Sequence, residues 1–389
     1  MTQRRIGLIR ARKLCGHTQE SLARALGVEP TTIRNWESGR REPQPAFRPG
    51  LAVALGLSLA DLDQALTPPE TDGVVSERAG EENLQLQAAL SATGSGHRVD
   101  TSMAASLHDR VRALCDQYDH APSALLISEA ANLHGRLVNL PTQTTDDRAR
   151  RRLHHAAAEV SILMGQVLWD ASARRDQSGP LGYFTSAVHH AEAAAEPDTL
   201  ALGRIRAGMV TLYGQHRPDR AATQFDQASR DCQAPIAAFA LLHAAESFAF
   251  ANQRAACEAA LESAETLAGH VDPADPHAEL CSPRTFARMA GSCMLQLDAL
   301  PDAIRLLNGA WVQRKKSNAI VLSNLAAAHT RQGDLDSAAA HLHLAIDELE
   351  RTRSGGGMKA AATAARQLRL RGFPRDGEVH DRLISLMAS

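Results

Sequence analysis

The strongest constraint on the fold is a two-helix pattern in the stretch LSNLAAAHTRQGDLDSAAAHLHLAI, residues 322–346. A first helical stretch carries a small residue, a turn at Gly333 follows, and a second stretch places three apolar residues on one face. These four positions are Ala326, Ala338, Leu342 and Ala345. Apolar residues at this spacing predict amphipathic helices, and the short turn makes the two helices antiparallel.

The same offsets from the small residue, 12, 16 and 19 positions, recur earlier in the chain. One copy comprises Gly291, Ala303, Leu307 and Ala310, and another comprises Ala244, Ala256, Ala260 and Ser263. A further copy has Ala221, Phe225 and Ala228, but Met209 stands at its small position. Ala187 lies 34 residues before Ala221, which extends the period toward the amino end.

Small residues at these positions allow two helices to approach closely, while the bulky residue fills the groove toward the next pair. One pair cannot bury its apolar face alone, so the pairs are expected to stack into an α-solenoid. These residues and spacings resemble tetratricopeptide repeats over residues 200–349. Over residues 153–195 the likeness is weaker, because the stretch SGPLGYFT is expected to form a loop there. A non-repeating alanine-rich bundle is the alternative that short alanine patterns leave open.

Composition divides the chain into three parts. Residues 1–66 carry ten Lys and Arg against six Asp and Glu, whereas residues 67–100 carry two against six and are rich in Gly, Ser and Thr. We therefore expect an amino-terminal domain at 1–66 and a flexible linker at 67–100. Residues 101–389 show long 3.6-residue periods and no alternating strand pattern, which predicts a helical-repeat domain. The predicted fold class is all-α throughout.

Within the amino-terminal domain, two short helical patterns flank a corner at Gly27 and Val28. Thr18 is expected to cap the first helix, because its hydroxyl can accept a hydrogen bond from a free amide of the first turn. Gly27 permits the left-handed conformation that ends a helix. Pro30 fits the first position of the next helix, where no amide hydrogen is needed.

The second helix presents a polar outward face, because Ile33 and Trp36 are expected to face inward. A compact helix-corner-helix with such a face suits insertion of the second helix into a DNA major groove, which is about 12 Å wide. Asn can bond adenine twice, Arg can bond guanine, Thr methyl groups can contact thymine, and further Arg and Gln side chains can hold phosphates. The residues predicted to contact DNA are Gln19, Pro30, Thr31, Thr32, Arg34, Asn35, Arg40 and Arg41.

Residues 6–66 resemble the phage-repressor-like Xre family of helix-turn-helix DNA-binding domains. The matching residues are Thr18, Gln19, Leu22, Ala23, Leu26, Gly27, Val28, Ile33, Trp36, Glu37, Gly39, Leu55, Gly56, Leu57, Asp61 and Leu62. The resemblance implies five short helices and base contacts by Thr31, Arg34 and Asn35. It also implies a structural pair between Arg12 and Glu37.

The sequence departs from this family pattern at two positions. His17 replaces the usual apolar residue before Thr18, and Glu29 replaces the usual Ser or Thr cap of the second helix. The Glu29 carboxylate complements the helix dipole but can also repel a nearby phosphate, so we expect modest affinity. The alternative interpretation is a small interaction bundle whose arginines only solvate its surface.

The helical-repeat domain offers a second candidate site. Stacked helix pairs form a concave groove, and arginines there suit a carboxylate, which favours a peptide or another small acidic ligand. The candidate ligand-binding residues are Arg206, Tyr213, Arg288, Ser292, Ser323 and Asn324. The alternative is that both arginines solvate the surface or pair within the array.

A dimer is expected because one helix-turn-helix domain reads only a few base pairs. The repeats, or a helix expected at 358–371 after the break at Gly355–Gly357, would supply the contact. A helix-turn-helix joined to such an array resembles the peptide-pheromone receptor regulators of Gram-positive bacteria. The resemblance implies a sensing role for the repeats. With no apolar run or secretory signal in the sequence, we therefore predict a cytoplasmic, homodimeric transcription regulator that senses a peptide, a small ligand or a protein partner.

Other chemistry finds little support in the sequence. There is no run of about 18 apolar residues, and the six cysteines include no Cys-x-x-Cys pair. The pairs His154-His155 and His189-His190 lack the i, i+4 spacing of a helical metal clamp, and no phosphate loop or catalytic triad is recognisable. We therefore predict no metal, no cofactor and no enzymatic activity. A protein-interaction scaffold and an unrecognised helical enzyme are the alternatives.

Overall fold

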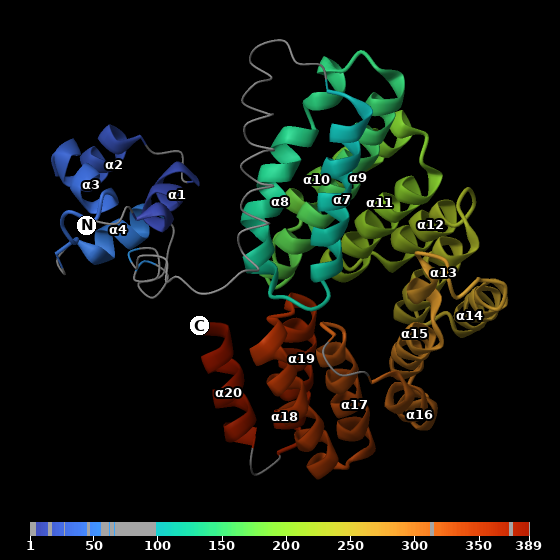
Figure 1. The fold of residues 1–389 in the computed structure, drawn as a ribbon. Coiled ribbons are helices and arrows are strands. Elements are labelled where there is room, and N and C mark those ends of the chain that lie inside the picture. Colours follow the sequence, from blue (N-terminus) through green and yellow to red (C-terminus); the bar gives the residue numbers. More distant parts are fainter. Residues whose placement is uncertain are drawn as a thin grey trace. The chain divides into compact units, whose positions relative to one another are not determined.

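The structure, a computed structural model, describes residues 5–14, 18–26, 28–44, 47–55, 62, 66, 99–311, 315–372 and 376–388. These residues form helices and no strand, which confirms the predicted all-α fold class. The chain divides into two compact units, residues 1–97 and 98–389, and each is described by itself (Figure 1). The predicted linker at 67–100 lies outside the described residues except for Val99 and Asp100, so the three-part division stays a prediction.

The first unit packs short helices around one apolar core. Its helices are α1 (Ile6–Leu14), α2 (Gln19–Leu26), α3 (Pro30–Glu37) and α4 (Arg48–Ala54). The core contains Leu8, Leu22, Ala23, Ile33, Trp36, Leu51 and Leu55. Leu62 and Leu66 are helical and also buried, but the rest of the expected fifth helix lies outside the described residues, as does the corner residue Gly27.

The second unit is an array of antiparallel helix pairs. Its α-helices are α7 (Thr101–Gln117), α8 (Ser123–Leu137), α9 (Asp147–Ala171), α10 (Ser178–Ala194), α11 (Pro197–Met209), α12 (Pro218–Ala228), α13 (Ala234–Phe250), α14 (Arg254–Ala268), α15 (Pro283–Gln296), α16 (Leu300–Ala310), α17 (Asn318–Gln332), α18 (Leu335–Thr352), α19 (Gly355–Leu370) and α20 (Asp376–Ala388). Short 3-10 turns are η2 (Leu140–Gln143) and η4 (Ala278–Cys281), and η3 (Val210–Gly214) is a π-helix. The pairs follow one another along a curved array (Figure 1).

The repeat pattern is confirmed in the last two helix pairs. Ala326, Ala338, Leu342 and Ala345 are fully buried between α17 and α18. In the preceding pair, a Cβ atom added to Gly291 would lie 2.7 Å from Cγ of Leu307, so only glycine permits this approach of α15 to α16. Close helix contact at the small position therefore has a direct steric cause.

In the pair α13 and α14 the predicted register is wrong by one residue. The buried residues of α14 are Cys257, Leu261 and Ala264 with Ala260, whereas Ser263 is exposed. Cys257, Leu261 and Ala264 follow Ala245 at the same offsets of 12, 16 and 19 positions. Neighbouring alanines at 244 and 245 are equally small, so side-chain size could not distinguish the two registers.

Met209 is also not the small position of its pair. A Cβ atom added to Gly208 would lie 2.6 Å from the Phe225 ring, which makes Gly208 the residue of closest approach. The π-helix η3 directly follows α11, and a π-helical turn accommodates one additional residue. That additional residue accounts for the displacement from the expected position.

Two expected breaks in the helical pattern are helical instead. The stretch SGPLGYFT forms the start of α10, because the carboxylate of Asp176 accepts hydrogen bonds from the amides of Ser178 (3.1 Å) and Gly179 (3.3 Å). Pro180 then falls in the first turn, where its missing amide hydrogen is not needed. The glycines 355–357 are likewise the first turn of α19, which begins three residues before the expected helix at 358–371.

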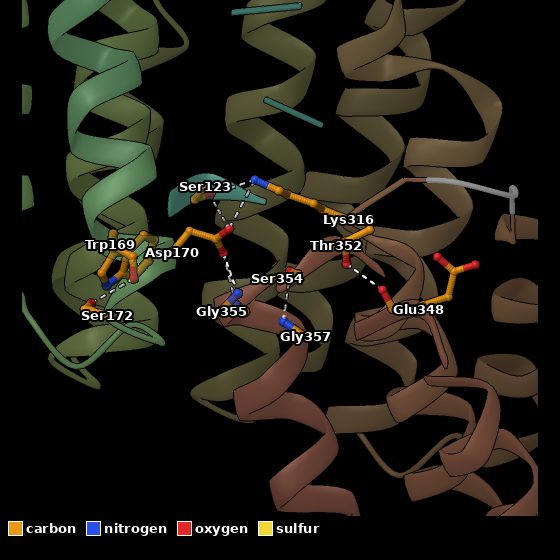
Figure 2. Close-up of polar contacts among 11 residues, drawn as sticks. Ser123, Trp169, Asp170, Ser172, Lys316, Glu348, Thr352, Ser354, Gly355 and Gly357 are labelled. Atoms are coloured by element: carbon orange, nitrogen blue, oxygen red, sulfur yellow. Dashed lines mark hydrogen bonds and ion pairs between the residues drawn. The ribbon is translucent and has the colours of Figure 1, made fainter. Parts of the chain in front are cut away.

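The two ends of the array meet at the buried side chain of Asp170, at the end of α9. One carboxylate oxygen accepts hydrogen bonds from the amides of Gly355 (2.6 Å) and Gly356 (3.4 Å) at the start of α19. The other accepts the Ser123 hydroxyl (2.7 Å) and lies 3.3 Å from the Lys316 ammonium (Figure 2). This cluster, which we call the Asp170 junction, joins segments 185 residues apart in the sequence.

We expect Gly355→Ala to destabilise the second unit. Its added Cβ atom would lie 2.0 Å from the carbonyl oxygen of Asp170, and both backbones would have to shift. Such overpacking costs about 1–3 kcal/mol of unfolding free energy, which denaturant unfolding of the full chain can measure. The matched control is Gly135→Ala in α8, where the new methyl group meets no atom within 4 Å, and a small stabilisation is expected. Equal effects of the two substitutions would contradict this account of the junction.

Histidine pairs lie between helices of the second unit. Nδ1 of His154 on α9 and Nδ1 of His190 on α10 are 2.9 Å apart, so at least one ring must be neutral to accept the hydrogen bond. Burial, with a smaller contribution from charge repulsion by His154, His189 and His134, lowers the pKa of His190 to about 4. The folded protein therefore favours the neutral ring, and this contribution to stability is lost as the pH falls from about 6.5 toward 4.

We expect His190→Gln to reduce the acid sensitivity of the fold. Thermal unfolding at pH 7 and pH 4.5 should show a smaller fall in melting temperature for this variant than for the wild type, because it has one fewer group that takes up a proton on unfolding. His380→Gln, a change at an exposed position of α20, is the matched control and should behave as the wild type. An unchanged fall in His190→Gln would refute the role given to this histidine.

Candidate functional site

The candidate nucleic-acid interface is built on α3. This helix begins at Pro30, and Glu29 before it is extended, with φ −74° and ψ 145°. Glu29 makes no side-chain cap bond, as expected for a residue that replaces the usual Ser or Thr, and only its carbonyl accepts the amide of Thr32 (2.8 Å). The proline therefore defines the start of the helix more than the cap does.

The two faces of α3 are divided as the sequence predicts. Ile33, Trp36 and Glu37 are buried against the rest of the unit. Thr31 and Arg34 are exposed, while the intermediate residues of the outward face are Pro30, Thr32 and Asn35. Packing therefore requires one face only, and the other is free for contact with a partner.

A polar hydrogen-bond network leads from the buried side of α3 to its outward face. The carboxylate of Glu37, which is 4% exposed, accepts hydrogen bonds from Nε of Arg12 (2.5 Å) and from the side-chain amide of Gln19 (2.5 Å). The amide oxygen of Gln19 in turn accepts Nε of Arg34 at 3.2 Å. The expected pair of Arg12 with Glu37 is confirmed, and through Gln19 it also orients Arg34.

The polar residues enclose a hollow of about 540 Å³ on the surface of the first unit. It is lined by Gln19, Thr31, Arg34, Asn35, Glu37, Ser38 and Arg40. The chain turns after α3 through Gly39, whose φ of 73° is left-handed, and the amide of Arg41 then bonds the carbonyl of Asn35 (3.2 Å). The structure thus brings together five of the predicted DNA-binding residues around this hollow, whereas Pro30, Thr32 and Arg41 are not part of its lining.

Comparison with known proteins identifies this part of the chain. A family model described as helix-turn-helix matches residues 8–62. Residues 8–62 form a helix-turn-helix domain. The match confirms the family resemblance stated for this part of the sequence, and the helix-turn-helix domain includes the whole hollow described above.

No curated protein matches the chain. Among solved structures, the crystal structure of Bacillus thuringiensis PlcR in complex with the peptide PapR7 and DNA is 11% identical and covers 79% of this chain and 95% of that chain. Its TM-score is 0.33, too low to establish a common fold. Within the described residues, no helix is both long and apolar enough to cross a membrane.

Outside the helix-turn-helix domain, the predicted ligand-binding residues separate into two groups. Arg206 on α11 and Arg288 on α15 both line a cavity of about 320 Å³ in the second unit. Tyr213 instead donates its hydroxyl hydrogen to the buried Glu246, and Ser323 is 1% exposed and donates to the carbonyl of Ala319. The two remaining predicted residues, Ser292 and Asn324, are half-buried and do not line the cavity.

Several cavity residues were missed by the sequence analysis. They are Tyr118, Trp169, Asp170, Arg174 and Lys316. All of them lie at helix ends or in connections, whereas the repeat pattern describes only the paired helices. Consecutive glycines at 355–357 were the one signal in the sequence, because a helix tolerates them where another backbone approaches closely.

One group of side chains offers donors of the kind that bind metals. A nitrogen of His108, a nitrogen of His155 and an oxygen of Glu159 lie within 4.8 Å of one another. Hydrogen bonds already join His108 to Glu159 (2.8 Å) and His155 to Thr199 (3.0 Å). The group is therefore satisfied as a polar contact among α7, α9 and α11, and we propose no metal role for it.

We expect Glu37→Gln to loosen the helix-turn-helix domain. The change removes the negative charge that faces the buried guanidinium of Arg12, and breaking a buried ion pair costs about 3–5 kcal/mol. Amide hydrogen exchange of α2 and α3 in the full chain should accelerate accordingly. Glu20→Gln is the matched control, because Glu20 is exposed and lies 3.9 Å from Arg34, so its loss should cost less than about 1 kcal/mol. Unchanged protection in Glu37→Gln would contradict the supporting role of the network.

Proposed function

We propose that the protein is a sequence-specific DNA-binding transcriptional regulator that acts as a homodimer. The observation that carries this proposal is the polar outward face of α3 in a helix-turn-helix domain, held from below by Glu37 and Gln19. A surface that only solvates the protein would not require a buried ion pair to orient one of its arginines. The same observation disfavours a scaffold in which this domain serves assembly alone.

The chemistry of the face suits base recognition. With α3 in a major groove, Asn35 can bond adenine bidentately, Arg34 can bond guanine, and the Thr31 methyl group can contact thymine. Arg40 and Arg41 follow the helix on an exposed turn and can bind phosphates. Gln19 retains a second amide hydrogen for a phosphate, because only one is needed for Glu37.

Dimerisation would allow two helix-turn-helix domains to bind two half-sites. The end of the second unit supports this proposal, because Ile384 and Met387 lie three residues apart on α20 and are 52% and 49% exposed. Large apolar side chains that share an exposed helix face suit burial against a second copy. In this proposal the helical unit dimerises and senses a peptide, a small ligand or a protein partner, and the protein acts in the cytoplasm by binding rather than by catalysis.

We expect Arg34→Ala combined with Asn35→Ala to abolish sequence discrimination while leaving salt-dependent, non-specific binding. Each bidentate base contact contributes about 1–3 kcal/mol, so the preference for sequences selected from random DNA should fall at least tenfold. Fluorescence anisotropy with selected and scrambled duplexes measures the ratio. Arg40→Ala should instead weaken binding to both duplexes and reduce the salt slope by about 1.

The matched control for these variants is Arg230→Ala, which removes one exposed positive charge from the other unit. It should leave both affinities unchanged. If selection from random DNA enriches no sequence for the wild-type chain, the regulator proposal fails and the scaffold alternative is favoured.

A further inference from the structure

The cavity of the second unit lies where the two ends of the helical array meet. Its walls come from the segment after α7, the end of α9, and from α11, α15 and α17, and it shares Asp170 and Lys316 with the Asp170 junction (Figure 2). Its volume of about 320 Å³ is within the range of small-molecule sites. The cavity therefore exists only while the array is closed.

Positive charge dominates the lining of this cavity. Arg174, Arg206, Arg288 and Lys316 face two acidic residues, Asp119 and Asp170. The carboxylate of Asp170 is already paired with the Lys316 ammonium and hydrogen-bonded to the Gly355 amide. None of the three arginines forms an ion pair with a described carboxylate, so the cavity retains a surplus of two positive charges.

Two buried hydrogen-bond donors in the same lining have no hydrogen-bond partner among the residues that the structure describes. They are Nε of Arg206 and the indole nitrogen of Trp169. Burial lowers the pKa of Arg206 most; Tyr118 and Asp119 raise it, and repulsion from Arg174 and Arg288 lowers it again. Buried polar groups are nearly always hydrogen-bonded. These two unbonded donors, in a lining whose three arginines form no ion pair, therefore indicate a site for a negatively charged acceptor.

The cavity also offers an apolar and aromatic wall. Its side chains are Leu163, Trp169, Phe184, Met209 and Ile320, with the ring of Tyr118 under the Lys316 ammonium at 4.0 Å. The Arg174 guanidinium lies 4.6 Å from the centre of the Trp169 ring, which holds it against this wall. A ligand that fits must therefore have an apolar body as well as acidic groups.

We propose that this cavity binds a small organic dianion, with carboxylate or phosphate groups on Arg206 and Arg288 and an apolar body against Trp169. From the volume that a water molecule occupies, about 30 Å³, the space of about 320 Å³ accommodates about eleven non-hydrogen atoms. An extended peptide of several residues does not fit within it. This proposal names the class of ligand for the sensing role in the proposed function, and its regulatory meaning rests on that function. Ligand binding itself can be tested separately.

Isothermal titration calorimetry of the full chain with two aromatic dianions, phthalate and phenylphosphate, tests the proposal. We expect one-to-one binding of at least one probe at millimolar concentration or below, and the tighter probe identifies the preferred acid group. Phthalamide, a neutral analogue of phthalate, should bind at least tenfold more weakly. Absence of binding by both dianions, or equal binding of phthalamide, overturns the proposal.

Substitutions then locate the site. Arg206→Met and Arg288→Met should each lower probe affinity by about tenfold to a hundredfold, because each removes a charged hydrogen bond. Arg204→Met is the matched control on α11, since Arg204 faces Glu192 at the surface, and should bind as the wild type. Probe binding that survives both cavity substitutions refutes the assignment.

A purely structural role for Arg206 makes the opposite prediction for stability. If Arg206 serves a ligand, Arg206→Met should leave the melting temperature of the ligand-free chain unchanged or raise it, because a charge without an ion-pair partner and with a buried, unbonded Nε is removed. A lower melting temperature would instead favour a structural role and contradict the proposal. Selection from random DNA tests the helix-turn-helix domain separately, so failure of DNA recognition with intact probe binding refutes only the proposed function.

Discussion

The closed form of the helical array depends on the buried carboxylate of Asp170. A charge in the protein interior is stable only when every lone pair has a partner, and Asp170 obtains four from three separate segments. Two of those partners are amides of a glycine helix start, which no side chain obstructs. Together with the Lys316 amide on the Asp119 carbonyl (3.1 Å) and the Lys359 ammonium on the Tyr213 carbonyl (2.7 Å), this contact joins the two ends of the array beside the arginine-lined cavity.

The helix-turn-helix domain uses the same device at smaller scale. Glu37 is buried and accepts hydrogen bonds from Arg12 and Gln19. Gln19 in turn accepts a hydrogen bond from Arg34 and so orients it. In both units a buried acid therefore positions groups that face outward or into a cavity. The acids are structural, and the arginines that they leave unpaired or merely oriented are the ones available to a partner.

The sequence predicted the helical architecture and the faces of α3 because both follow from periodicity. Ile33 and Trp36 faced inward as expected, and the buried positions of α17 and α18 matched their spacing. The register of α14 could not be predicted from the sequence, because adjacent alanines in the alanine-rich stretch before it have equal size. The cavity could not be predicted, because Trp169 and Lys316 meet only through tertiary closure and no local pattern relates them.

Closure of the array also determines when the second unit can finish folding. Asp170 receives its amide partners from residues 185 positions later, so the contact is among the most non-local in the chain. During synthesis, α7 to α18 must leave the ribosome before the buried carboxylate acquires those donors. Until that moment the Asp170 carboxylate lacks two of its four partners, so full burial of this charge is a late step in the folding of the second unit.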